Sequence, residues 1–177
     1  MIQISLNLFV YGLFSKQKPT ALNKEQNSRW ITGFIDGESN FQVYLDREYL
    51  KVMFRIRLHI DDIAVLFSIR DFLGAGRVRQ NGNNCQFIIS DVNSLTTVLI
   101  PLLDQYGLFT SKWLDYLDFK LVVAHLSSSN TTRLSSIQLA WVRSIMSGMN
   151  SGRISYNYDL IPRAATHCKS LLVTWFY

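Results

Sequence analysis

A carboxylate, Glu38, ends a short apolar stretch that carries two glycines at helical spacing. Residues 30–38 read as a helix, and Gly33 and Gly37 fall on one face of it, one turn apart. Each glycine costs about 1 kcal/mol relative to alanine inside a helix, and this cost makes sense if another backbone comes very close. The dipole at a helix C-terminus disfavours a carboxylate, so we expect a positive group beside Glu38. A divalent cation is the simplest candidate.

Two segments after this helix alternate between apolar and polar residues, which is the pattern of half-buried strands. Phe41, Val43 and Leu45 face one way in the first segment, and a turn at residues 47–50 leads to the second. In the second segment the alternation sets Val52, Phe54, Ile56 and Leu58 against Lys51, Met53, Arg55 and Arg57. The pattern predicts an antiparallel hairpin with one apolar face and one polar face.

A second hairpin and several helices complete the expected order. Asp61 or Asp62 is expected to cap a helix over residues 63–73 that stops at Gly74. Strands follow at residues 76–80 and 85–90, and the turn signal of residues 81–84 joins them. Further helices are expected at 92–105 with an interruption near Pro101, at 111–126 and at 135–149. The order αββαββα predicts an α+β fold with one mostly antiparallel four-stranded sheet and the helices on one face.

The sheet face that the helices leave open is rich in arginine and amide side chains. It carries Gln42, Tyr44, Lys51, Arg55, Arg57, Arg77, Arg79, Asn81 and Gln86. A paired ribbon fits the DNA major groove, where arginine can form paired hydrogen bonds with guanine, and glutamine and asparagine with adenine. A solvated sheet face is the ordinary alternative. Four arginines with amides among them favour a face that binds nucleic acid.

Composition places the chain among folded domains and leaves its partner open. The 177 residues suit one domain with tails, 48% of them are hydrophobic and 13% aromatic, and the net charge of +5 permits a polyanionic partner. Cys85 and Cys168 have no metal-ligand spacing, and the three histidines are scattered. The apolar run at residues 4–14 is too short to span a bilayer and lacks the charged start of a secretory signal, so we expect no membrane partner.

Residues 31–39, with the strand that follows them, resemble the signature of the LAGLIDADG homing endonucleases. They fill the nine motif positions, with Glu38 at the acidic metal-binding position and Ser39 where the family most often has glycine. The resemblance covers about residues 30–150, and residues 101–112 look like the end of the family's first repeat. We therefore expect an endonuclease domain at residues 28–150.

Two flanking regions are expected around this domain. Residues 1–27 read as an N-terminal extension and polar linker, with Asn27 or Ser28 capping the first helix. Residues 151–177 read as a C-terminal tail, and residues 154–177 resemble the linker that precedes a second repeat in two-motif members. No second copy of the motif is present in the sequence, so the chain fits either a one-motif homodimer or the first half of a two-motif protein.

The resemblance implies a metal-dependent DNA endonuclease whose active centre lies between two motif helices. Glu38 and Lys112 would be catalytic, and Glu38 with the Gly37 carbonyl would bind Mg2+. Gly33, Gly37 and Phe34 would line the dimer interface, bringing two Glu38 side chains together. The open sheet face would be a DNA-binding saddle, with contacts from Gln42, Tyr44, Arg55, Arg57, Arg77, Arg79, Asn81 and Gln86. Leu58 stands where many members carry a glutamine.

Three functions compete on this sequence. The first is a sequence-specific endonuclease that acts as a homodimer on a long, near-palindromic double-stranded DNA site. The second is an intron maturase that binds intron RNA. Basic residues of the helical tail could serve it, although a solvated face is the more common role of such a pattern: Arg133, Arg143, Arg153, Arg163 and Lys169. The third is an inactive DNA-binding remnant. The resemblance alone implies a mitochondrial or other organellar location, because many members of the family are intron-encoded there.

Overall fold

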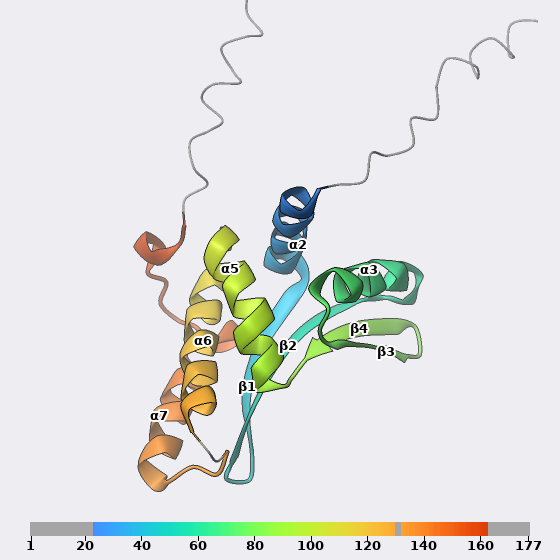
Figure 1. The fold of residues 1–177 in the computed structure, drawn as a ribbon. Helices are drawn as coiled ribbons and strands as arrows, with labels where there is room; N and C mark the ends of the chain where they lie inside the picture. The colour runs from blue at the N-terminus through green and yellow to red at the C-terminus, as the bar shows by residue number, and fades with distance from the viewer. Residues whose placement is uncertain (1–22, 130–131, 163–177) are drawn as a thin grey trace, which may run out of the picture.

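The computed structural model describes residues 23–129 and 132–162, and it confirms the predicted order of elements (Figure 1). The strands are β1 (Ser39–Asp46), β2 (Tyr49–His59), β3 (Arg77–Asn81) and β4 (Asn84–Ile89). The helices are α2 (Lys24–Glu38), α3 (Ile63–Leu73), α4 (Val92–Ser94), α5 (Ile100–Tyr106), α6 (Lys112–Ser128) and α7 (Ser136–Ser147). Short 3-10 turns lie at Ile60–Asp62, Asn150–Gly152 and Tyr158–Leu160, and a π-helical turn lies at Leu95–Leu99.

The four strands form one antiparallel sheet in the order β1-β2-β4-β3. Phe54 of β2 lies opposite Phe41 of β1 on one side and opposite Ile89 of β4 on the other. Directly opposed residues point to the same face of a sheet, so these three buried side chains mark its apolar face. Helices α2, α3, α5 and α6 lie on one side of the curved sheet (Figure 1). The register directs the alternating polar residues of the strands to the other face.

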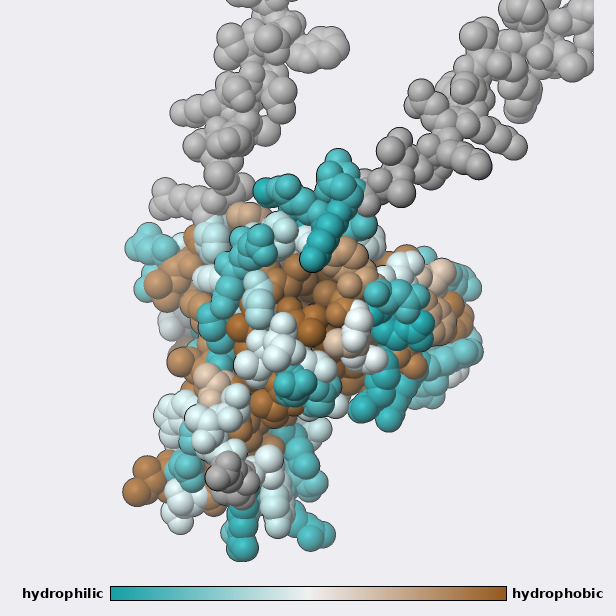
Figure 2. Space-filling model, in the orientation of Figure 1, coloured by the Kyte–Doolittle hydropathy of each residue, from teal (hydrophilic) through white to brown (hydrophobic). Residues whose placement is uncertain are grey.

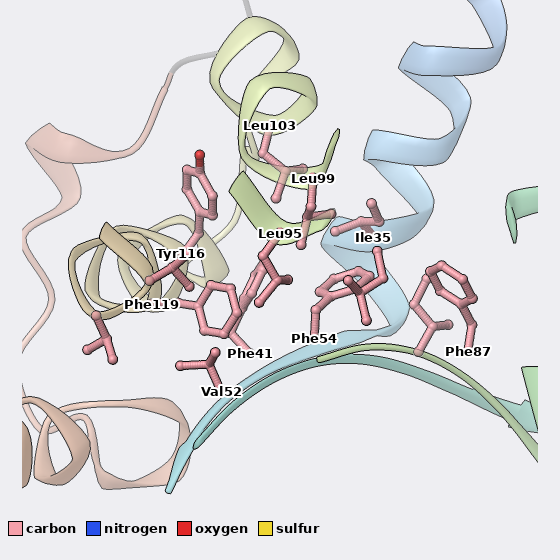
Figure 3. Packing of buried hydrophobic residues seen from close by; sticks show 14 of the residues in the cluster. Ile35, Phe41, Val52, Phe54, Phe87, Leu95, Leu99, Leu103, Tyr116 and Phe119 are labelled. Carbon is pink, nitrogen blue, oxygen red and sulfur yellow. The ribbon is translucent and has the colours of Figure 1, made fainter. Parts of the chain in front are cut away.

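The core lies between the sheet and these helices (Figure 3). The ring of Phe41 lies 5.4 Å from that of Phe54, 5.7 Å from that of Tyr116 and 5.2 Å from that of Phe119, measured between centroids. Ile35 of α2 points into the same space. The aromatic residues thus join β1 and β2 to α6, while Ile35 fixes the second half of α2 on the sheet.

The start of α2 differs from the expectation. The helix begins at Lys24 and is capped by Asn23, so the prediction that Asn27 or Ser28 caps it was wrong. The Asn23 side chain accepts a hydrogen bond from the Gln26 backbone at 2.8 Å, and the Gln26 side chain accepts one from the Asn23 backbone at 2.9 Å. This reciprocal capping box satisfies two backbone N–H groups at once and favours the earlier start.

Two further helix signals had different outcomes. The α3 helix ends as predicted at Gly74, whose φ of +64° is a left-handed conformation that glycine adopts without strain. Asp62 stands at its N-cap, but within the described chain its side chain accepts no capping bond, because the turn Ile60–Asp62 already leads into the helix. The interruption expected near Pro101 is the π-helical turn Leu95–Leu99 just before it.

Several predictions concern residues outside the described ranges. These are the extension at 1–22 with its apolar run, Cys168, Arg163 and Lys169. Within the described ranges, the structure contains no helix that combines the length and the apolar character needed to cross a membrane. The segment of residues 151–162 contacts the rest of the domain through Arg153, whose side chain donates hydrogen bonds to Asp115 and Asp118 of α6.

Candidate functional site

Helix α2 has one face in the core and another that the described chain leaves open. Ile31 and Ile35 are buried, whereas Gly33 and Gly37 are exposed. A Cβ built on either glycine would meet no neighbouring group of the described chain within 4 Å. Packing among residues 23–129 and 132–162 of one protomer therefore gives no steric reason for glycine at either position. The helix-propensity cost of both glycines remains, and a backbone from a second protein unit would account for it.

Two aromatic rings extend this open face. Trp30 is 45% exposed and stacks on Phe34, with ring centroids 5.3 Å apart. Phe34 was expected at an interface, but Trp30 was not, although its spacing of four residues from Phe34 places it on the same face. An exposed tryptophan beside two glycines marks a surface suited to contact with another protein.

Glu38 is the last residue of α2, and its side chain is exposed. The last turn of the helix holds no basic residue. A hollow beside the carboxylate is lined by Glu38 together with Phe34, Arg57, Leu58, His59, Asp62, Val65 and Asn84. Glu38 therefore shares this hollow with an arginine of the open sheet face and with Leu58, the position where the family resemblance suggested a glutamine.

Lys112 is the first residue of α6, and its side chain reaches the end of α2. The ammonium Nζ donates to the Ile35 carbonyl at 3.2 Å and to the Gly37 carbonyl at 3.0 Å. Burial lowers the pKa of Lys112, and the charges of Asp36 and Glu38 raise it but offset only part of that effect. The fold thus brings Lys112 and Glu38, which are 74 positions apart in sequence (112 − 38), to one helix end.

The oxygen atoms at this helix end suit a hard divalent cation but do not complete its coordination. Glu38 offers a carboxylate and Gly37 a carbonyl, and both are ligand types that Mg2+ prefers. The Gly37 carbonyl accepts from Lys112, yet a carbonyl oxygen has two lone pairs. Among the described residues no group of three or more histidine, cysteine or acidic side chains could hold a metal. Further ligands would have to come from another protein unit, from DNA or from water.

The sheet register places the predicted DNA-contacting residues on the open face. Gln86 of β4 lies between Arg57 of β2 and Arg79 of β3, directly opposite each. By the same alternation the open face holds Gln42, Tyr44, Arg55, Arg57, Arg77, Arg79, Asn81 and Gln86. The amide of Gln86 is thus flanked by two guanidinium groups, and side chains of these types are the ones that contact bases and phosphates in protein–DNA complexes.

A second row of the same face repeats this arrangement. Ile88 of β4 lies between Arg55 and Arg77 and is only 5% exposed although it faces away from the helices. Arginine stems can cover apolar surface while their charged ends stay in water. In the first row the Arg57 Nε donates to the Asn84 side chain at 3.3 Å, which brings Asn84 into this surface as well. Sequence reasoning placed Asn84 only in a turn.

The end of the β1–β2 hairpin has a different character. Tyr44 lies opposite Lys51, and both are exposed. Glu48 at the turn forms an ion pair with Arg133 at 2.9 Å. The arginine-rich part of the face is therefore confined to β2, β3 and β4, and the hairpin end is mixed in charge.

The basic residues considered for RNA binding that the structure describes, Arg133, Arg143 and Arg153, have different surroundings. Arg153 is 13% exposed and forms ion pairs with Asp115 at 2.8 Å and with Asp118. Arg133 is engaged with Glu48, and Arg143 is exposed on α7. Arg153 thus serves to fix the segment after α7 to α6.

The helical side of the molecule mixes hydrophilic and apolar surface and has an apolar hollow below the beginning of α2 (Figure 2). This hollow is lined by residues of α2, α3 and the segment 97–106, namely Lys24, Glu25, Ser28, Arg29, Phe72, Leu73, Thr97, Val98, Pro101, Leu102, Gln105 and Tyr106. The α2 residues in it belong to the first two turns. With a rise of about 1.5 Å per residue, the helix carries Glu38 roughly 20 Å from Glu25. The hollow is therefore separate from the Glu38 end.

Comparison with known proteins identifies the fold and its relatives. The sequence profile of the LAGLIDADG endonuclease family matches residues 31–123. The chain is 34% identical over 93 residues to "Probable intron-encoded endonuclease 2" of Neurospora crassa, a match covering 51% of this chain and 21% of that protein. It is 29% identical over 97 residues to "Uncharacterized mitochondrial protein RF1" of Saccharomyces cerevisiae, covering 54% and 21%.

A solved structure shares the architecture over most of the chain. The I-LtrWI LAGLIDADG homing endonuclease bound to target DNA superposes with a TM-score of 0.66 and 27% identity, covering 87% of this chain and 55% of that chain. The chain thus spans about a fifth of the length of the two curated relatives and about half of this structure.

Proposed function

We propose that this chain, which belongs to the LAGLIDADG endonuclease family, forms half of a metal-dependent endonuclease that cuts double-stranded DNA at a specific sequence. The observation that carries the proposal is the meeting of Glu38 and Lys112 at one end of α2, beside an open sheet face that holds four arginines. The relatives named above are described as intron-encoded or mitochondrial, so we also propose an organellar intron as the source of the chain.

The open face of the sheet would bind the DNA. Its four arginines supply contacts to phosphates and guanines, and Gln42, Gln86 and Asn81 supply amides that can pair with adenine. These side chains stand on adjacent strands of one ribbon-like surface, which is the shape that enters a major groove. The structural relative bound to target DNA supports a DNA duplex as the partner.

A second copy of the fold would complete the active centre. The exposed glycines of α2 allow two such helices to approach closely, and each would bring its Glu38 to the contact. Two carboxylates held close together repel, and a bound cation relieves that repulsion. The incomplete ligand set among the described residues of one protomer and the match to about half of the solved relative both support a second copy. We propose a second molecule of this chain as its source.

The residues at the helix end have separate tasks in this scheme. Mg2+, when bound, would supply an activated water and neutralise charge on the scissile phosphate. Glu38 and the Gly37 carbonyl would hold it. Lys112 keeps its ammonium at the helix end, where it would stabilise negative charge that develops on the phosphate. Leu58 has no hydrogen-bonding side chain, so the nucleophilic water would be ordered by other groups.

The test is Glu38→Gln, with Glu25→Gln as the matched control on the same helix. Glu25 is exposed and pairs with Arg29 at the other end of α2. A target duplex is first selected from a randomised pool with Ca2+ as the metal, and cleavage is then measured in Mg2+. We expect Glu38→Gln to reduce the single-turnover rate at least about a hundredfold with little change in DNA affinity, and Glu25→Gln to leave both unchanged. Cleavage by Glu38→Gln at the wild-type rate would refute the metal assignment.

A further inference from the structure

We propose that Asp36 and Thr110 are positioning residues that hold the Lys112 ammonium against the end of α2. This inference rests on the proposed role of Lys112 in DNA cleavage. The Asp36 carboxylate organises the segment that delivers Lys112.

The Asp36 carboxylate binds the loop that precedes α6 through both of its oxygens. Oδ2 accepts hydrogen bonds from the backbone N–H of Phe109 at 2.8 Å and of Thr110 at 3.1 Å. Oδ1 accepts one from the Thr110 hydroxyl. Hydrogen bonds to an ionised carboxylate are stronger than those between neutral groups. Asp36 therefore fixes this loop to α2 through three bonds between segments 73 and 74 residues apart.

The Thr110 hydroxyl connects Asp36 to the backbone of Lys112. Its Oγ1 accepts a hydrogen bond from the Lys112 backbone N–H at 3.2 Å. Ser111 stands at the N-cap of α6, but no backbone N–H of the described helix bonds to its side chain. Thr110 thus takes over a capping task that the N-cap residue does not perform.

Lys112, which Thr110 and Asp36 link to α2, also bonds to α2 directly. Lys112 returns to α2 through the bonds from Nζ to the carbonyls of Ile35 and Gly37, the residues on either side of Asp36. Both ends of the lysine are therefore tied to the same turn of one helix, the backbone end through Thr110 and the ammonium end directly. A free lysine side chain has many rotamers, and catalysis requires the charged end in one place. The hydrogen bonds at both ends of Lys112 restrict its side chain in this way.

A loss of Lys112 positioning can be distinguished from a general loss of stability, because only the latter would lower both the cleavage rate and the DNA affinity. Freeing Lys112 should slow cleavage without weakening DNA binding, because the arginines of the sheet face are untouched. It should also have no further effect once Lys112 itself is removed, because a positioning residue acts only through the group it positions.

The main variant is Thr110→Val, which keeps the shape of the side chain and removes the hydroxyl. Its control is Thr97→Val, which makes the same replacement at an exposed threonine whose hydroxyl bonds to the Asn93 carbonyl. Asp36→Ala is the second variant, and circular dichroism verifies that each protein is folded. The first measurement needs no DNA: the acetylation rate of Lys112 by sulfo-NHS-acetate, followed by peptide mass spectrometry. We expect a rate about tenfold higher in Thr110→Val and Asp36→Ala, and unchanged in Thr97→Val.

The second measurement is single-turnover cleavage of the selected duplex in Mg2+. We expect Thr110→Val to lower the rate about tenfold at unchanged DNA affinity, and to add nothing in a Lys112→Met background. An unchanged acetylation rate in folded Thr110→Val and Asp36→Ala would overturn the positioning role, and so would additive losses with Lys112→Met. If the wild-type protein cut no selected duplex, the proposed function would fail, and the acetylation result would still decide the positioning of Lys112.

Discussion

Replacing Gly33 by alanine should stabilise one protomer and weaken its assembly. The new Cβ meets no other group of the described chain within 4 Å, so no described residue of the protomer opposes it. Alanine in an exposed helix interior is favoured over glycine by about 1 kcal/mol, and the isolated protomer should gain that amount. In a two-fold dimer the two added methyl groups lie where two helices are proposed to touch. Overpacking of that kind costs about 2 kcal/mol or more in total, which corresponds to a roughly 30-fold rise in dimer Kd.

The two effects are measured separately. Urea unfolding at nanomolar protein concentration reports on the protomer, because an assembled form would make apparent stability depend on concentration. Sedimentation velocity over a concentration series reports the dimer Kd. The Kd compares folded protomer with folded dimer, so the gain in helix propensity does not offset the loss at the interface. Ser68→Ala on α3 is the control, since Ser68 is exposed and, among the described residues, its hydroxyl bonds to the Ala64 carbonyl of its own helix alone.

Three results would refute the reasoning. A protomer destabilised by Gly33→Ala would mean that another part of the chain packs on this glycine. An unchanged Kd would place the interface elsewhere. A wild-type protein that stays monomeric at high micromolar concentration, alone and with the selected duplex, would refute the homodimer and leave a second motif in a longer protein as the source of the second half.

Two further predictions concern charge on opposite sides of the molecule. Arg79→Ala on the open sheet face should reduce the slope of log K against log salt for duplex binding by about 1, and Arg143→Ala on α7 should not; equal slopes in a fluorescence-anisotropy titration would contradict a phosphate contact by Arg79. Arg153→Ala should cost about 3 kcal/mol in urea unfolding, because it removes the ionic partner of Asp115 and Asp118 and leaves Asp115 with the hydrogen bond from the Asn150 backbone N–H. Arg29→Ala, in an ion pair that is largely exposed, should cost under about 1 kcal/mol, and similar costs for the two variants would contradict this role of Arg153.

Local patterns were sufficient to predict the elements and faces of this fold. A strand has a period of two, so apolar Phe41 and Phe54 could be assigned to one face and Arg55 and Arg57 to the other before pairing was known. Gly74 could be assigned as a helix end because its position requires a conformation that other residues avoid. The strand order was not predicted, because the pairing of β2 with β4 depends on contacts between distant residues.

The site was only partly predictable for the same reason. Glu38 could be named from its own helix, since an acid at a helix C-terminus is unusual on local electrostatic grounds. The link from Asp36 to Thr110 spans 74 residues, and no local pattern encodes it. The start of α2 was predicted too late although its signal was local. Asn23 and Gln26 have the spacing of a capping box. The prediction followed the apolar pattern instead, and that pattern begins only at Trp30.

In the proposed dimer, assembly and chemistry would depend on the same half of α2. Gly33 and Gly37 lie five positions and one position before Glu38, so a two-fold contact through them would bring two Glu38 carboxylates together. The described residues of one protomer provide too few side-chain ligands for a metal ion, and a dimer would double them while adding a repulsion that a cation relieves. Metal binding and dimer formation would then favour each other by linkage. A lone protomer could bind DNA through its arginines without being able to cut it. The arrangement would confine cleavage to sites long enough to engage both sheets, and this restriction would itself contribute to sequence specificity.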